Sequence, residues 1–425
     1  MTGRTIAEAV SDARARGIRD LLGGRAALWG AFAAVHALLA WLNLVAPGYP
    51  MGDVTGVYRV WAETAQHGWL RMGIDTPWVY PILAFAPMTA ALAFGSEWYG
   101  QAWLGMVALL DALAFSVLLG RGTLSRRRRA AAWWWVVFLA LLGPIALGRI
   151  DAVTVPFAVV GLLWAAGRPR VAATLLTLGA WIKVWPAALV ASLVVALRRR
   201  SDVAMTAVAL SVGILGVSLI AGSGLNAFGF VAQQAGRGLQ VEAPLAVPWL
   251  WWIVAGSDEA TIAYDRGILT FQVEGPGADV AAALTTPLLA IGVAAVLAVG
   301  VRAAMRGAPA VALLPPLALA FTTVLMLANK VGSPQFVTWL AAPVILGIVM
   351  GGGRFLTPAA LTASIALLTH VIYPYWYGWL LIANAGFVLL LTLKVVLLLV
   401  LFAWAVLRVW QAGSARRPTR VDAAA

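Results

Sequence analysis

The chain has 425 residues, of which 62% are hydrophobic and only 11% are charged. Soluble domains carry charge on about a quarter of their residues, so this composition excludes a soluble protein and is typical of a membrane protein. The formal net charge of +13 comes from short basic clusters between apolar runs, a pattern that orients membrane proteins and does not indicate nucleic-acid binding.

The two ends of the chain are predicted to be polar tails. The chain has no cysteine, which excludes disulfides and thiolate metal sites. Its first residues are rich in arginine, and no signal-peptide cleavage site follows the apolar run behind them. We therefore expect cytoplasmic tails at 1–25 and 411–425, with one transmembrane domain at 26–410 between them.

About twelve membrane spans are predicted when the basic clusters are placed on the cytoplasmic side. The first covers 26–47 and leads to an outer loop at 48–97. Within this loop, the run at 80–95 is short and contains prolines, which predicts a helix lying in the outer membrane interface. The later spans are predicted at 98–120, 130–148, 152–167, 171–183, 185–198, 203–222, 280–301, 309–328, 336–350, 356–372 and 380–409.

A second outer loop is predicted at 223–279. It contains "TIAYDRGILTFQVEG", whose β-rich arms flank the turn Asp265-Arg266-Gly267, and we expect a small exposed hairpin there. The predicted fold is therefore an all-α polytopic membrane protein with interfacial helices and one small outer hairpin. No internal repeat is evident, which weakens a transporter interpretation, because many transporters are built from repeats.

Polar side chains gather at the predicted outer ends of the spans. Such residues are costly near hydrocarbon and are therefore candidates for function. One strong acid among several cations suits an anionic substrate that arrives from the bilayer, such as a lipid phosphate. The set comprises Asp53, Arg149, Asp151, Lys183, Gln233, Arg237, Glu242, Lys330, Gln335 and His370.

Several of these residues also have a purely structural interpretation. Asp53 could cap the helix that follows it. Lys183 and Lys330 could extend their ammonium groups towards the interface. For His67 and His370, interfacial hydrogen bonding is the preferred interpretation over catalysis or ligation.

Local ion pairs are a further alternative for the charged residues. Arg149 could pair with Asp151 in "GRID", and Arg237 could pair with Glu242 in the second outer loop. The acids are otherwise dispersed and the histidines lie far apart, so we expect no bound metal.

Three motifs carry a resemblance to a known family. Asp53 lies just beyond the first span and is followed by "VYRVWAETAQHG", with Tyr58 five residues after the acid, and then by "YPILAFAP", which begins at Tyr80. A small-residue-rich helix runs into "IKVWP", a Lys-x-x-Pro element. In these features the chain resembles the integral-membrane glycosyltransferases of family 87, which have the GT-C fold. "GRID" stands where that family often has Gly-Gln-x-Asn, so the roles of Arg149 and Asp151 are assigned from their position at the outer face and not from the resemblance.

The resemblance implies an inverting enzyme that moves a sugar from a polyprenyl-phosphate donor to a lipid-linked or cell-envelope glycan. Such enzymes act at the outer face of the plasma membrane. In actinobacteria they include mannosyltransferases and arabinofuranosyltransferases, and mannose is the first expectation here. The family acid maps onto Asp53 as general base. No cofactor is implied, because the lipid-linked sugar is a substrate.

These expectations give roles to most of these polar residues. The donor phosphate would contact Lys330, Lys183 and Arg237, and the interfacial helices at 54–68 and 80–95 would shape a groove for its lipid tail. The remaining substrate contacts are assigned to Tyr58, Tyr80, Arg149, Asp151, Glu242, Gln335 and His370. The alternatives are a transporter or flippase for a lipid-linked sugar or other amphiphile, and an assembly scaffold.

Overall fold

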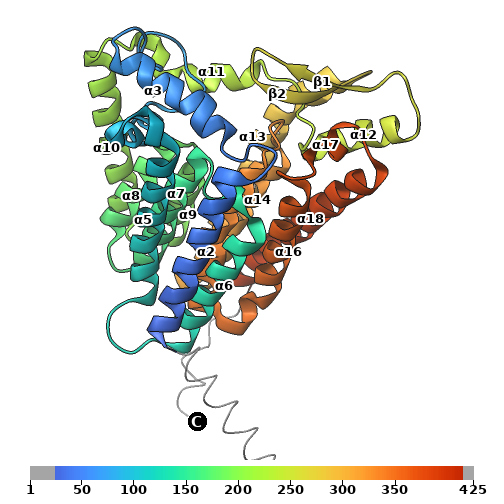
Figure 1. Ribbon diagram of the computed structural model, residues 1–425. Coiled ribbons are helices and arrows are strands. Elements are labelled where there is room, and N and C mark those ends of the chain that lie inside the picture. Colours follow the sequence, from blue (N-terminus) through green and yellow to red (C-terminus); the bar gives the residue numbers. More distant parts are fainter. Residues whose placement is uncertain (1–23, 415–425) are drawn as a thin grey trace, which may run out of the picture.

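The computed structural model describes residues 24–414, which form a bundle of helices with one two-stranded sheet (Figure 1). The predicted tails at 1–25 and 411–425 lie mostly outside these residues. Seven helical segments are long and apolar enough to cross a membrane, which confirms an α-helical polytopic membrane protein. They are α2 (Arg25–Val45), η4 (Ser96–Trp98) with α5 (Tyr99–Leu119), α10 (Arg200–Ile220), α13 (Ala278–Met305), α14 (Ala310–Leu327), the segment Pro334–Ile372, and α18 (Ala385–Ala412).

The segment Pro334–Ile372 is interrupted by 3-10 turns. It consists of η8 (Pro334–Leu340), α15 (Ala341–Gly351), η9 (Gly352–Phe355) and α16 (Leu356–Ile372). Gly352 has a positive φ of 57°, which breaks the helix between α15 and α16. The two spans predicted at 336–350 and 356–372 are therefore confirmed as separate helices.

Four further helices are shorter than an ordinary span. They are α6 (Arg126–Leu142), α7 (Ile150–Trp164), α8 (Pro169–Ile182) and α9 (Pro186–Ala196). The 11 residues of α9 rise about 16 Å, roughly half the thickness of the hydrocarbon core. The helices predicted at 171–183 and 185–198 are confirmed as α8 and α9, which are joined by a short turn at "KVWP". The total of about twelve spans stays a prediction.

The irregular segments gather at one end of the bundle, the top of Figure 1. The helical turns at 80–95 and the hairpin both occur as predicted, and the hairpin pairs Thr261 with Glu274 through Asp265 with Thr270. The helices within 223–279 were not predicted. The elements of this end are η1 (Asp53–Tyr58), α3 (Arg59–Gln66), η2 (Ile82–Ala84), α4 (Phe85–Ala90), η3 (Ala91–Phe94), η5 (Pro144–Ala146), η6 (Gly224–Phe228), α11 (Gly229–Ala235), η7 (Pro244–Ala246), α12 (Val247–Val254), β1 (Thr261–Asp265), β2 (Thr270–Glu274) and α17 (Tyr377–Leu381).

The core of the bundle lies around α7, α14 and α15, which are buried along almost all of their length. Helices α10 and α13 stand at the periphery and expose apolar side chains such as Val208, Val217 and Ile291. In water such surfaces would be unfavourable, whereas lipid tails cover them at no cost.

Two loops are packed against each other at the irregular end. The backbone N–H of Gln240 donates to the carbonyl of Lys330 at 3.0 Å, and that of Val273 donates to the carbonyl of Leu239 at 2.9 Å. Gly332 presses directly on the backbone of Glu242, so that a Cβ atom at this position would overlap it. The segment 239–243 is therefore held between β2 and the 330–332 loop.

Candidate functional site

A cavity of about 690 Å³ opens among the irregular segments. The starts of α7 and α9 and the end of α8 meet at it. Its wall combines contributions from segments far apart in the sequence. They include η1, the loop before η2, the α8–α9 turn, α11, the hairpin tip, the loop before η8 and the residues before α17.

Asp53 lies in the cavity wall at the first position of the π-helix η1. Its carboxylate makes no hydrogen bond that caps the helix, so the capping interpretation is wrong. Oδ2 is 3.0 Å from Nε of Arg149, and the side chain is 43% exposed. Within residues 24–414, Oδ1 accepts no hydrogen bond, so this oxygen is available to a ligand in the cavity.

Arg149 is buried and fixed by several acceptors. Its guanidinium donates to the carbonyls of Pro50 and, at 2.8 Å, of Gly148, and to the hydroxyl of Tyr373 at 2.8 Å. The predicted local pair of Arg149 with Asp151 is therefore wrong, because Arg149 pairs with Asp53. The arginine thus ties the carboxylate to two other segments of the chain.

Asp151 lies behind the cavity wall and pairs with Lys183. The carboxylate is 0% exposed, and its Oδ1 accepts a hydrogen bond from Nε1 of Trp339 at 2.7 Å. Its Oδ2 is 3.8 Å from Nζ of Lys183 and accepts no hydrogen bond. A direct substrate contact was predicted for Asp151, but its burial keeps the carboxylate away from the cavity. Its connection to the cavity is the ion pair with Lys183.

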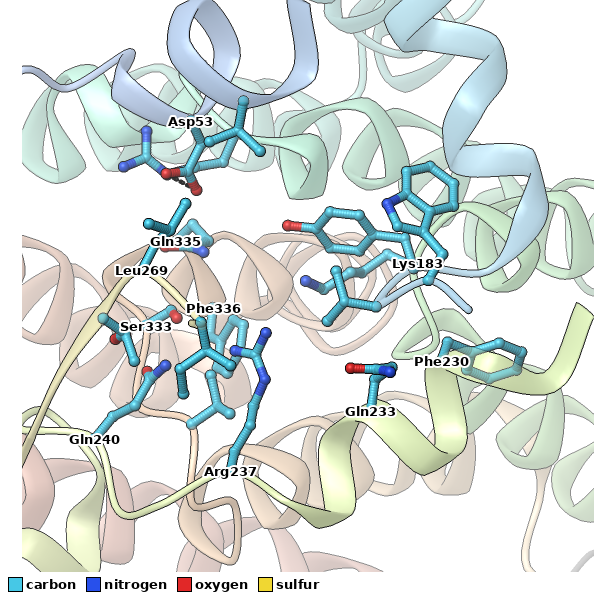
Figure 2. A pocket seen from close by; sticks show the side chains of 18 of the residues that line it. Asp53, Lys183, Phe230, Gln233, Arg237, Gln240, Leu269, Ser333, Gln335 and Phe336 are labelled. Carbon is cyan, nitrogen blue, oxygen red and sulfur yellow. Dashed lines mark ion pairs between the residues drawn. The ribbon is translucent and has the colours of Figure 1, made fainter. Parts of the chain in front are cut away.

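Lys183 projects into the cavity from the α8–α9 turn (Figure 2). Its Nζ lies 4.7 Å from the ring centroid of Tyr80 and 5.7 Å from that of Phe336. Cation–π contact with these faces, together with the charge of Asp151, holds the ammonium group in place. The snorkelling interpretation is therefore wrong, because the side chain turns into the cavity.

Arg237 enters the same space from the opposite wall, with Gln233 of α11 beside it (Figure 2). It makes no ion pair with any residue between 24 and 414, and its Nε is buried without a hydrogen-bond partner. Burial lowers the pKa of the Arg237 guanidinium, which nearby Tyr80, Asp265 and Asp53 offset in part. Arginine stays protonated under all ordinary conditions, so Arg237 brings an uncompensated positive charge to the cavity.

Three more predicted residues line the cavity. Gln335 lies in η8 near Asp53 (Figure 2). The hydroxyl oxygens of Tyr58 and Tyr80 are 3.3 Å apart. Burial raises the pKa of both phenols, so both hydroxyls stay protonated and able to donate.

Two predicted residues lie outside the cavity wall. Lys330 is buried, and although its neighbours Asn329 and Val331 line the cavity, its own side chain does not. Burial lowers the pKa of the Lys330 ammonium group. His370 packs against Gly143, with Nε2 3.4 Å from the hydroxyl of Tyr375. The predicted contacts of these two residues with substrate therefore do not fit the geometry.

Glu242 lines the cavity but pairs with a residue that sequence reasoning did not connect to it. Its Oε2 is 2.6 Å from Nζ of Lys394, and both side chains are almost fully buried. The predicted pair of Glu242 with Arg237 is therefore wrong. A lone lysine inside the apolar run of α18 was the available signal, because such a charge requires an opposite partner.

In the described ranges, no group of three or more histidine and acidic side chains is placed to hold a metal ion. Comparisons with protein-family models, with curated proteins and with solved structures found no match to this chain. The chemistry of the cavity is therefore the basis on which we infer a function.

The Lys394–Glu242 pair predicts a large effect on stability. Lys394→Met leaves the Glu242 carboxylate buried without its cation, which costs about 3–5 kcal/mol. Lys394→Met combined with Glu242→Gln removes both charges and should recover much of that loss. Thermal unfolding in lipid nanodiscs, followed by tryptophan fluorescence, measures both variants.

The exposed pair of Arg170 and Asp202 supplies the control. Their atoms are 3.1 Å apart and the Arg170 side chain is 73% exposed, so Arg170→Met should cost at most about 1 kcal/mol. Equal unfolding temperatures for Lys394→Met and Arg170→Met would contradict an anchoring role for the buried pair.

Proposed function

We propose that this protein is an integral-membrane glycosyltransferase that moves a sugar from a polyprenyl-phosphate donor to a lipid-linked or cell-envelope glycan. The observation that carries the proposal is the cavity in which the Asp53 carboxylate faces the same space as the cations of Lys183 and Arg237. One carboxylate suits a base, and two cations suit a departing phosphate. Mannose is the first candidate for the sugar, and arabinofuranose is the second.

Asp53 acts as general base in the proposed reaction. The acceptor hydroxyl oxygen bonds to the anomeric carbon of the donor while its proton passes to Oδ1 of Asp53. The bond from the anomeric carbon to the phosphate oxygen breaks on the opposite face, and the electron pair leaves with the phosphate. The configuration at the anomeric carbon is thereby inverted. Arg149 holds Oδ2 and so aims Oδ1 at the cavity.

Lys183 and Arg237 hold the donor phosphate. They approach from opposite walls, so a phosphate between them meets an ammonium group on one side and a guanidinium group on the other (Figure 2). The contacts of Lys183 with Tyr80 and Phe336 fix its position before the donor binds. Cations preorganised in this way stabilise the charge that develops on the leaving phosphate. A good leaving group of this kind needs no general acid.

The proposed orientation places the cavity at the outer face of a bacterial plasma membrane, with both termini in the cytoplasm. It is supported by the basic cluster at 126–129, which begins α6 behind the N-cap Ser125. Arg128 of this cluster donates to the carbonyls of Val117 and Leu118 at the end of α5. In this orientation the twelve predicted spans correspond to α2, α5, α6, α7, α8, α9, α10, α13, α14, α15, α16 and α18.

The orientation predicts which sites a membrane-impermeant maleimide reaches. Since the chain has no cysteine, Thr261→Cys on β1 and Arg306→Cys after α13 each introduce one reporter at an exposed position. Intact cells should label Thr261→Cys, whereas Arg306→Cys should be labelled only after permeabilisation. The reverse pattern would place the cavity on the cytoplasmic side.

The chemistry predicts that Asp53→Asn abolishes transfer while the protein remains folded. Loss of a general base lowers the rate by about 10²–10⁴-fold. Purified protein in nanodiscs receives mannosyl-phosphoryl-polyprenol and a lipid-glycan extract, and mass spectrometry detects hexose addition to the acceptor. Glu97→Gln, an exposed acid outside the cavity wall, is the matched control and should retain full activity.

Three other outcomes would revise the account. Equal transfer by wild type and Asp53→Asn would support the transferase activity but exclude Asp53 as its general base. Transfer only with an arabinofuranosyl donor would change the sugar. If neither donor supports transfer by the wild type, the transporter or flippase becomes the better account.

A further inference from the structure

A row of four aromatic rings runs along one wall of the cavity. The ring of Tyr264 lies 4.8 Å from that of Phe271, measured between centroids, and Phe271 lies 6.4 Å from Tyr377. Tyr377 in turn lies 5.5 Å from Tyr373. All four side chains line the cavity, and none is fully buried. Part of each side chain is therefore exposed at the cavity wall.

The row connects the rim of the cavity to the proposed base. At one end, Tyr264 of β1 is 47% exposed. At the other, the hydroxyl of Tyr373 accepts a hydrogen bond from Arg149, which pairs with Asp53. A ligand that follows the rings from the rim therefore arrives beside the Asp53 carboxylate.

The row is held in a fixed arrangement. Phe271 lies in β2, and its carbonyl accepts a hydrogen bond from the backbone N–H of Val241 at 3.2 Å. The neighbouring Glu242 is anchored to Lys394 at 2.6 Å. The hairpin is thus joined to the cavity wall, so the rings are preorganised and a ligand does not have to order them.

Apolar ring faces and polar groups lie side by side along the row. Burial raises the pKa of the Tyr373 and Tyr377 phenols, and the charge of Glu242 adds to the effect at Tyr377, so both hydroxyls remain protonated. Glu242 lines the same wall, with its carboxylate buried and paired with Lys394. A lipid tail cannot form hydrogen bonds with such groups. A sugar can pack its face of C–H bonds against the rings and form hydrogen bonds through its hydroxyls with the polar edges.

We propose that the aromatic row of Tyr264, Phe271, Tyr377 and Tyr373 binds the acceptor glycan as a chain of at least two sugar residues, with the reacting hydroxyl at Asp53. This inference rests on the proposed function, because it assigns the acceptor to one wall and leaves Lys183 and Arg237 to the donor. The acceptor is thus selected by its carbohydrate chain, and Tyr264 at the rim contacts the residue farthest from the reaction.

Binding of free oligosaccharides tests the row without any transfer. Saturation-transfer NMR titrations of the protein in nanodiscs compare monosaccharides with tetrasaccharides of mannose, glucose, galactose and arabinose. At least one tetrasaccharide should bind at least about tenfold more tightly than its monosaccharide, because even one added aromatic contact contributes up to about that factor. Tyr264→Ala should lower the tetrasaccharide affinity by about the factor of one contact, and Tyr264→Phe should retain it.

Tyr49→Ala is the matched control, since Tyr49 is 86% exposed and lies outside the cavity wall. The row is overturned if no tetrasaccharide outbinds its monosaccharide, or if Tyr264→Ala and Tyr49→Ala behave alike. It is also overturned if Tyr264→Ala weakens binding of farnesyl phosphate instead, because the row would then hold the lipid.

These outcomes separate the row from the proposed function. Length-dependent binding that requires Tyr264 supports the row even if no sugar transfer is found. If the protein transfers sugar and Tyr264→Ala leaves the KM for the acceptor unchanged, the transferase function is supported. The aromatic row is then excluded as the acceptor site.

Discussion

The guanidinium of Arg149 joins the start of α7 to two other segments of the chain at the wall of the cavity. It binds the carbonyl of Pro50 before η1, the carboxylate of Asp53 in η1 and the hydroxyl of Tyr373 after α16. An arginine buried among apolar helices loses its hydration, which costs several kcal/mol unless acceptors surround it. The burial of Arg149 therefore requires these segments to meet, and their meeting creates the cavity wall on which Asp53 is displayed.

The same constraint places the other charges. Asp151 and Glu242 are almost fully buried, and each faces one lysine, Lys183 or Lys394. These acids keep their lysines fixed, the first inside the cavity and the second behind its wall. Arg237 differs, because no carboxylate of the described chain pairs with it. In the proposed function an anionic ligand supplies the missing partner, which is the electrostatic basis for placing the donor phosphate at this position.

Much of the fold could be predicted from the sequence. Apolar length predicted α2, α5, α10, α13 and α14, because the thickness of the bilayer sets a minimum that few other structures share. The hairpin followed from β-rich arms around a turn. The helices between 223 and 279 were missed, since short helices inside a loop have no apolar period long enough to detect.

The candidate site was predicted less completely. Asp53, Lys183 and Arg237 line the cavity as expected, but the partners of the charges were wrong. Arg149 and Asp151 are two residues apart at the start of a helix, a spacing that turns their side chains in different directions. The partner of Glu242 lies 152 residues away in α18. Such pairs depend on tertiary packing, which no local pattern encodes.

The most direct test is a structure of the protein in nanodiscs with a donor analogue. The analogue is mannosyl-phosphoryl-polyprenol with a carbon link that cannot be transferred, and the structure shows whether Lys183 and Arg237 hold its phosphonate. We expect the phosphonate to lie within about 3 Å of both Lys183 Nζ and the Arg237 guanidinium, with the anomeric carbon turned towards Asp53 Oδ1. A phosphonate bound elsewhere, or an empty cavity at saturating analogue, would contradict this expectation.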